Sequence, residues 1–155
     1  MKDSYTVKEA LQKLQAYCAY QERCHKDVEQ KLIGMNMIPD ARLLIVNKLI
    51  EDNYLNEERF AKHFVSGKFR IKKWGKNRIL RELKLRGISK YNIEIAMREI
   101  TYEDYVDTLH ELALKRLNQI TEKNVYKRKR KLCDYLLYRG WESNLVYEKA
   151  NELID

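Results

Sequence analysis

The chain has 155 residues, 45% hydrophobic and 35% charged, with one proline and five glycines. Few turn-forming residues and abundant Leu, Lys, Glu and Arg predict an all-α protein, and no segment shows the alternation expected of a strand. No apolar run reaches the roughly 18–20 residues that cross a bilayer. The N-terminal stretch MKDSYTVKEALQKL lacks the apolar core of a signal peptide. We therefore expect a cytoplasmic protein without a membrane partner.

Helical periodicity divides the chain into nine segments. Pro39, Asn56 and Ser89 stand where helices are expected to begin, and Gly87 and Gly140 stand where helices are expected to end. The segments fall into three groups of three, which predict three repeats at residues 1–55, 56–100 and 101–155. The predicted helices cover 7–20, 26–35 and 39–52 in the first group, 56–73, 75–87 and 89–100 in the second, and 101–120, 124–140 and 142–154 in the third.

The ends of the middle helices reveal the repeat. Asn36, Gly87 and Gly140 are each expected to adopt the left-handed conformation that terminates a helix. Aligned on these residues, three sets of apolar positions coincide, namely Val28, Ile79 and Leu132, then Leu32, Leu83 and Leu136, then Met37, Ile88 and Trp141. Because a three-helix unit of this length buries little alone, we expect neighbouring units to stack and so complete one another's cores.

Positive charge is concentrated in two segments. Residues 68–90 hold ten Lys and Arg against Glu82 alone, and residues 123–131 hold six cations and no acid. Clustered cations attract polyanions or acidic protein surfaces. We therefore expect a basic partner-binding surface. Its predicted members are Lys68, Arg70, Lys72, Lys73, Lys76, Arg78, Arg81, Lys84, Lys127, Arg128, Lys129, Arg130 and Lys131.

The helix expected near residues 76–86 illustrates the choice between a solvated face and a binding surface. Ile79 and Leu83 define its buried stripe, and Arg78, Arg81 and Lys84 fall on the opposite face. Like charges three residues apart repel by a few tenths of a kcal/mol per pair. A run of charge is usually only a solvated helix face. Here two such clusters lie at corresponding places in two repeats, and this favours a partner-binding surface over a solvated face.

Enzymatic catalysis is the least favoured function. His25, His63 and His110 are spread over three repeats, and the glycines form no phosphate-binding loop. Cys18, Cys24 and Cys133 have no metal-ligand spacing, and we expect them to be reduced and partly buried. No cofactor or metal is expected.

Residues 57–89, EERFAKHFVSGKFRIKKWGKNRILRELKLRGIS, resemble the signature of the RecX family of recombinase regulators. The matching pieces are Arg59-Phe60-Ala61, Phe64-Val65, Trp74-Gly75, Arg78-Ile79, Glu82-Leu83 and Gly87-Ile88. Weaker likeness in LIEDNYLNEERF and LLYRGW extends the resemblance over most of the chain. The resemblance implies three tandem three-helix repeats in an elongated, curved, solenoid-like array. It also implies a protein that binds the groove of a RecA-type recombinase filament on DNA and restrains strand exchange and ATP hydrolysis. We expect the protein to be a monomer.

Two other functions remain open. The basic clusters also suit a protein that binds DNA or RNA directly through phosphates, without a recombinase partner. No helix shows a base-reading pattern, so such binding would not be sequence-specific. The run KRKRK at 127–131 is similar to a polybasic membrane patch. The leucines beside it are needed for the core, which leaves no apolar face to insert into a bilayer.

Overall fold

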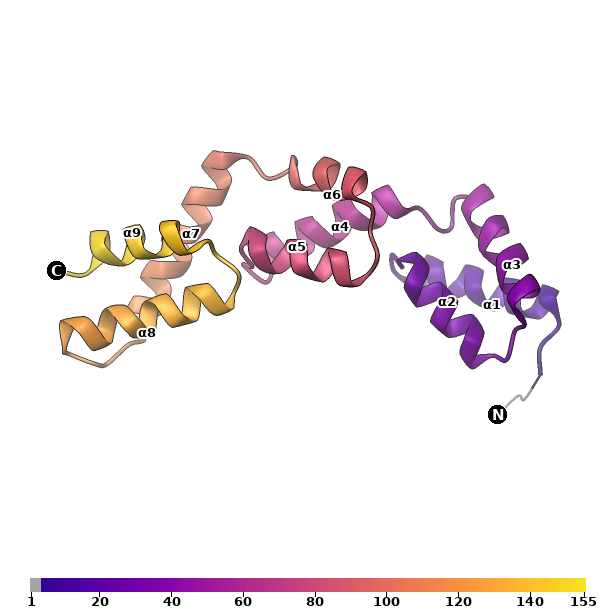
Figure 1. The fold of residues 1–155 in the computed structure, drawn as a ribbon, viewed down its shortest axis with the longest axis horizontal. Coiled ribbons are helices and arrows are strands. Elements are labelled where there is room, and N and C mark those ends of the chain that lie inside the picture. The colour runs from indigo at the N-terminus through magenta and orange to yellow at the C-terminus, as the bar shows by residue number, and fades with distance from the viewer. Residues whose placement is uncertain (1–3) are drawn as a thin grey trace.

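The computed structural model describes residues 4–155, and every regular element in that range is an α-helix (Figure 1). Residues 1–3 of the predicted first repeat and of the N-terminal stretch lie outside the described residues. None of the helices within 4–155 has the length and apolar character that a bilayer span requires. The helices are α1 (Val7–Tyr20), α2 (His25–Gly34), α3 (Pro39–Glu51), α4 (Glu57–Arg70), α5 (Lys76–Leu85), α6 (Lys90–Met97), α7 (Tyr102–Leu117), α8 (Val125–Tyr138) and α9 (Ser143–Leu153).

The predicted helix starts are confirmed by their caps. The Asn56 side chain accepts a hydrogen bond from the Arg59 backbone N–H at 2.9 Å, and Pro39 occupies the first turn of α3. Several helices end earlier than predicted. In α4 the predicted end at residue 73 is three residues too late, because Lys73 adopts a left-handed φ of 59°. Such a conformation cannot continue a right-handed helix.

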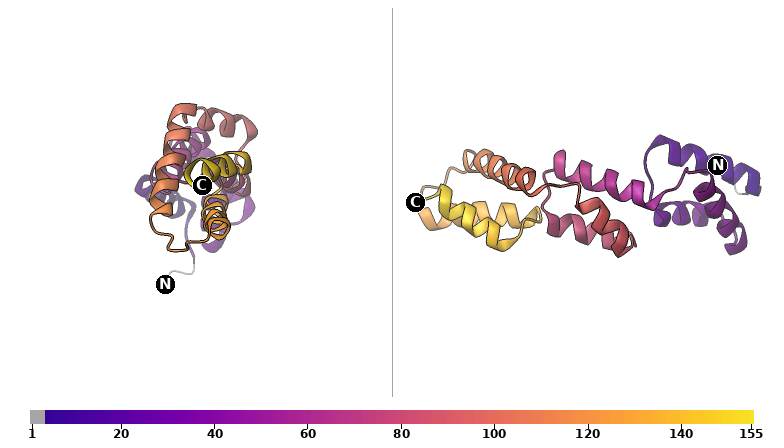
Figure 2. Two further views of the ribbon diagram at one scale, coloured as in Figure 1. Left: turned by 90° about the vertical axis from the view of Figure 1, so that its left-hand side faces the viewer. Right: turned by 90° about the horizontal axis from the view of Figure 1, so that it is seen from above.

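The predicted repeat of three helices is also confirmed. The residues after the middle helices, Asn36, Gly87 and Gly140, have φ values of 59°, 72° and 97°. All nine apolar positions that were aligned from the sequence are buried. The units follow one another along the long axis, with the two termini at opposite ends of the molecule (Figures 1 and 2).

The second and third repeats share one hydrophobic core, whereas the first has its own. The shared core runs from Phe60 in α4 to Ile154 after α9 and includes Phe69, Tyr105 and Trp141. The first core is built on residues such as Leu14, Leu32 and Leu49. Of the described residues in the first repeat, Cys24 alone joins the shared core. Stacking therefore completes a core between the second and third repeats but much less between the first and second.

The start of α5 docks on the end of α8. The backbone N–H of Gly75 donates to the Arg139 carbonyl at 2.9 Å, and that of Asn77 donates to the Gly140 carbonyl at 3.0 Å. Between them, the Lys76 N–H donates to the Tyr105 hydroxyl at 2.8 Å. These N–H groups have no partner inside their own helix. The positive end of the α5 dipole also faces the negative end of the α8 dipole, which stabilises the junction.

Two glycines allow this backbone-to-backbone contact. A Cβ on Gly75 would lie 2.5 Å from the Gly140 backbone, and a Cβ on Gly140 would lie 2.3 Å from the Arg78 Cβ. Gly140 also needs its φ of 97°, which side-chain-bearing residues rarely adopt. Neither position tolerates a side chain without separating the repeats.

Aromatic rings cover the same junction. Tyr105 and Trp141 stack with centroids 4.5 Å apart, and Phe69 lies 5.9 Å from Tyr105. The Trp141 Nε1–H donates to the Lys73 carbonyl at 3.1 Å, and the Tyr105 hydroxyl donates to Glu142. Burial and the hydrogen bond to Glu142 raise the pKa of Tyr105 above its ordinary value. The rings thus join α4, α7 and the start of α9 around the docked end of α5.

The first repeat is attached mainly by polar groups. Arg59 in α4 pairs with Glu22 in the loop after α1, and both side chains are partly exposed. The Lys26 ammonium, at the start of α2, donates to the Leu85 carbonyl at the end of α5 at 3.1 Å. Exposed ion pairs typically contribute about 0–1 kcal/mol each. The contact between the first and second repeats is therefore weaker than the contact between the second and third.

The three cysteines are buried and free, so the expectation of reduced thiols is met and their burial is more complete than expected. Burial raises the pKa of each thiol. Thiols in such surroundings are chemically inert.

Substitution of Gly140 tests the junction, with Gly87 as a matched control. Gly87→Ala introduces a left-handed alanine with nothing within 4 Å of its Cβ, so the free energy of unfolding should fall by about 1–2 kcal/mol from backbone strain. Gly140→Ala adds a collision with Arg78 and should cost about 1–3 kcal/mol more. Urea unfolding measures both. Equal losses in the two variants would contradict the close contact.

Tyr105→Phe removes the hydroxyl that links Lys76 to Glu142. The Lys76 N–H loses its acceptor and the Glu142 carboxylate loses a donor. Unfolding by urea at pH 7 should show a loss of about 1–3 kcal/mol, the usual cost of leaving partly buried polar groups unpaired.

The same variant should change the alkaline pH dependence. Because the folded-state pKa of Tyr105 is raised, its stabilising effect is complete below the unfolded-state pKa of about 10. It is lost as pH rises further, because only the unfolded state then releases the proton. Above pH 10, the free energy of unfolding should fall more steeply with pH in wild type than in Tyr105→Phe. The difference in slope should be up to about 1.4 kcal/mol per pH unit. Identical slopes above pH 10 would contradict a buried, hydrogen-bonded hydroxyl.

Candidate functional site

The thirteen predicted basic residues lie on the end of α4, the following loop, α5 and the first half of α8. They differ in exposure. Arg70, Lys72, Arg81, Lys84, Lys127, Arg130 and Lys131 are exposed, whereas Lys68, Lys73, Lys76, Arg78, Arg128 and Lys129 are partly buried. The structure divides them among several surroundings.

The middle helices of the repeats form a row along the molecule. The end of α8 meets the start of α5 through the junction described above, and the end of α5 meets the start of α2 through Lys26. Figure 1 shows α8, α5 and α2 following one another along the long axis. The α5 part of the first basic segment and the basic cluster on α8 therefore occupy neighbouring helices of one row. The fold brings α5 and α8 end to end although they belong to different repeats.

Arg78 lies where the two repeats meet. Its guanidinium is 4.1 Å from the centroid of the Trp74 ring and 5.2 Å from that of Tyr138. The Lys68 ammonium is 4.9 Å from the same Trp74 centroid. Tyr138 is 75% exposed, so this cation–π group combines one exposed aromatic ring with two partly buried cations. The sequence placed Arg78 on the outer face but not beside Tyr138.

Arg81 and Lys84 are exposed cations of α5 that are not neutralised by a carboxylate of the described residues. Neither makes an ion pair with any residue between 4 and 155, and the nearby carboxylate of Glu82 is bound to Arg86 at 2.9 Å. With Leu80 they line a shallow hollow of about 450 Å³ on α5. Unpaired exposed cations over a partly apolar hollow suit an acidic or phosphate-bearing partner.

The cluster on α8 is more neutralised than expected. Arg130 lies 4.0 Å from Asp134, and Lys131 lies 3.9 Å from Glu122. A backbone hydrogen bond from Asn124, with a smaller effect of nearby lysines, lowers the pKa of the Glu122 carboxyl. The expectation of a cluster without acidic partners is therefore wrong for these two cations. The sequence window 123–131 missed both acids because they lie just outside it.

Three of the remaining cations line two other hollows, and Lys76 lies over an aromatic ring. Lys129 donates to the Asn151 side-chain oxygen at 3.2 Å and lines, with Arg130, a hollow between α8 and α9. Lys68 and Lys72 line a separate cleft between the first and second repeats. Lys76 lies with its ammonium 4.6 Å from the Tyr105 ring centroid. Six of the thirteen predicted cations therefore line three separate hollows, two in each, and sequence periodicity could not separate these hollows.

Comparison with known proteins agrees with the repeat architecture. A family model for the second three-helix domain of RecX matches residues 56–97, and a model for the third matches residues 103–149. Together they span more than half of the chain. Both matched regions lie inside the predicted second and third repeats.

Curated relatives carry the same family name. The regulatory protein RecX of Lactobacillus gasseri is 31% identical over 92% of this chain and 54% of its own length. That of Clostridium botulinum is 30% identical over 86% of this chain and 63% of its own length. The chain thus spans about half to two-thirds of the length of these two relatives.

Solved structures of RecX proteins share the fold. RecX from Lactobacillus salivarius superposes with a TM-score of 0.81 at 25% identity, over 95% of this chain and 96% of that one. A second RecX structure gives a TM-score of 0.84 at 23% identity, over 94% of this chain and 73% of that one, and bears on the fold alone. With two family models matched in tandem, this chain belongs to the RecX family of regulatory proteins.

Proposed function

We propose that this chain regulates a RecA-type recombinase by binding the recombinase–DNA filament and restraining strand exchange and ATP hydrolysis. It acts in the cytoplasm as a monomer, without catalysis of its own. Membership of the RecX family supports the regulatory role. The single observation that carries the binding surface is the pair Arg81 and Lys84, exposed and without carboxylate partners in the described part of the chain.

The elongated shape supports binding along a filament. We propose that the units 1–55, 56–100 and 101–155 contact successive parts of one groove. Several modest contacts on one body act at high effective concentration, so they combine into tight binding. The rigid junction between the second and third repeats holds the basic faces of α5 and α8 in a fixed relative position. Because these faces are already ordered before binding, less entropy is lost when the partner binds.

Phosphate contacts contribute to the same surface. We propose that Arg81, Lys84 and Lys127, which are exposed cations in the row of middle helices, approach DNA phosphates held in the filament. Such contacts release counterions, so filament affinity should fall as salt increases. A protein that bound DNA alone would show equal affinity for bare DNA and for the filament at matched salt.

Charge reversal on α5 tests the proposed surface. Arg81→Glu with Lys84→Glu should weaken filament binding at least tenfold, because both charges face outward and repel the anionic partner after reversal. Anisotropy with labelled DNA carrying the recombinase measures affinity. Strand exchange and ATP hydrolysis, with the variant titrated in, measure function. Helicity and melting temperature should stay nearly unchanged, since both side chains are exposed and neither forms an ion pair with any residue from 4 to 155.

The control is Lys8→Glu with Lys115→Glu, which makes the same change in net charge on exposed residues outside the basic segments. It should leave filament binding within about twofold of wild type. Equal weakening by both double variants would mean that total charge, not this surface, governs binding. Unaltered inhibition of strand exchange by the α5 variant would place the contact elsewhere.

A further inference from the structure

One aromatic ring stands exposed where the second and third repeats meet. Tyr138 is the last residue of α8 and is 75% exposed, with the Arg78 guanidinium over its ring. Among the exposed tyrosines between residues 4 and 155, Tyr138 alone has a cation over its ring. A ring that is covered on one face and still three-quarters exposed has its other face in water. That face is open to a flat ligand.

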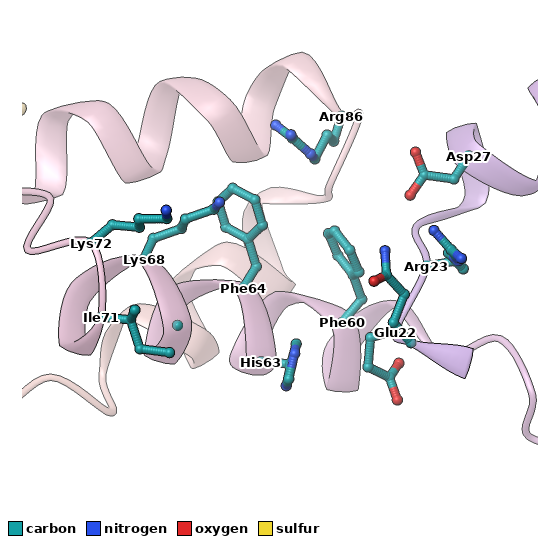
Figure 3. Close-up of a pocket in the computed structure, with 12 residues that line it drawn as sticks. Glu22, Arg23, Asp27, Phe60, His63, Phe64, Lys68, Ile71, Lys72 and Arg86 are labelled. Carbon is teal, nitrogen blue, oxygen red and sulfur yellow. The ribbon is translucent and has the colours of Figure 1, made fainter. Parts of the chain in front are cut away.

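Tyr138 is the outermost member of a stack of flat groups. The Arg78 guanidinium lies 5.2 Å from the Tyr138 centroid and 4.1 Å from that of Trp74. Trp74 meets the buried ring of Phe64 edge-on, with centroids 6.4 Å apart. Figure 3 shows Phe64 on α4, with the Lys68 side chain extending toward its ring. The stack therefore runs outward from the core of the second repeat and ends at Tyr138.

The junction between the repeats holds this outer ring in place. Directly after Tyr138, the carbonyls of Arg139 and Gly140 accept hydrogen bonds from N–H groups at the start of α5. The Arg139 guanidinium also donates to the Lys72 carbonyl. Arg78, on the other side of the ring, belongs to the docked first turn of α5. Because both neighbours of the ring are already fixed, a ligand that stacks on it orders little more of the protein.

Exposed cations continue the surface on both sides of Tyr138. Lys127, Lys131 and Tyr138 are separated by nearly whole numbers of helical turns, so they share one side of α8. Across the junction, Arg81 lies one turn beyond Arg78 on α5. Lys127, Lys131 and Arg81 are all exposed. The row of helices thus presents cations, then an open ring, then a further cation.

One carboxylate lies on the same side of α8. Asp134 falls between Lys131 and Tyr138, and its oxygen is 4.0 Å from Arg130. Glu122, in the loop before α8, is 3.9 Å from Lys131. Exposed ion pairs of this kind contribute about 0–1 kcal/mol each, so a phosphate group competes with them for the cations. The surface around Tyr138 therefore keeps an excess of positive charge.

We propose that Tyr138 stacks on a base of single-stranded DNA while Lys131 and Arg81 bind phosphates on either side of that base. Every base has a flat face, so stacking on an aromatic ring tolerates any sequence. In a duplex these faces are covered by neighbouring bases, so the ring favours single strands, whereas cations alone bind both forms. Because Arg81 also belongs to the surface proposed to contact the filament, this inference rests on the proposed function and adds a base contact to it.

The test compares two fluorescein-labelled 20-nucleotide strands, with the full chain and no recombinase present. One strand carries thymine throughout and the other is abasic, so their charges are equal and a difference in affinity reports contacts with bases. By fluorescence anisotropy, wild type should bind the thymine strand about fivefold or more tightly than the abasic strand. Tyr138→Ala should reduce this preference to within about twofold, and Tyr138→Phe, which keeps the ring, should retain it.

Two control variants separate stacking from charge. Tyr126 is 83% exposed on α8 and has no cation over its ring among the described residues, so Tyr126→Ala should keep the preference of wild type. Arg81→Ala should weaken binding of both strands and lower the salt slope by about one, because a phosphate contact is lost. Tyr138→Ala should leave the salt slope unchanged.

Equal affinity of wild type for the two strands would overturn the proposal. A loss in Tyr138→Ala that is the same for both strands would also overturn it, as would an equal loss of preference in Tyr126→Ala. A duplex that competes as well as the single strand, at equal phosphate concentration, would assign the surface to charge alone. None of these results bears on the regulation of a recombinase, which is tested separately by strand exchange with Arg81→Glu and Lys84→Glu.

Discussion

The first turn of α5 is capped by a different repeat, not by its own side chains. Gly75, Lys76 and Asn77 donate their N–H groups to two carbonyls after α8 and to the Tyr105 hydroxyl. This arrangement pairs donors that a helix start always leaves free and aligns the dipoles of α5 and α8. The absence of a Cβ at Gly75 and Gly140 is the steric condition for it. This contact therefore sets the position of α5 relative to α8, the two helices that carry the basic clusters.

The first repeat is attached to the second in a different way. Its own core is complete, and the ion pair of Arg59 with Glu22 and the hydrogen bond from Lys26 join it to the second repeat. Polar contacts at the surface add little stability. The cleft that carries Lys68 and Lys72 lies at this weaker boundary. The molecule therefore combines a rigid pair of repeats, which presents charge, with a cleft whose walls are joined by polar groups.

Local spacing was sufficient to predict the helices, the three-fold repeat and the buried stripe of Ile79 and Leu83, because each depends on residues within one turn or one cap. It could not place Arg78 against Tyr138, or assign Lys72 and Arg81 to different hollows, because those relations depend on how repeats pack. The expectation of an unneutralised cluster on α8 failed in part for the same reason. Glu122 comes within ion-pair distance of Lys131 only through the folded conformation of the loop before α8, which local spacing does not predict.

Native-state hydrogen exchange at the start of α5 tests the junction most directly. First-turn amides of an uncapped helix exchange quickly, whereas amides bonded across a packed interface open only when that interface opens. The amides of Gly75, Lys76 and Asn77 should therefore exchange with the same opening free energy as the core amides of α8. Exchange at nearly unprotected rates, while α8 remains protected, would contradict a rigid contact between the second and third repeats.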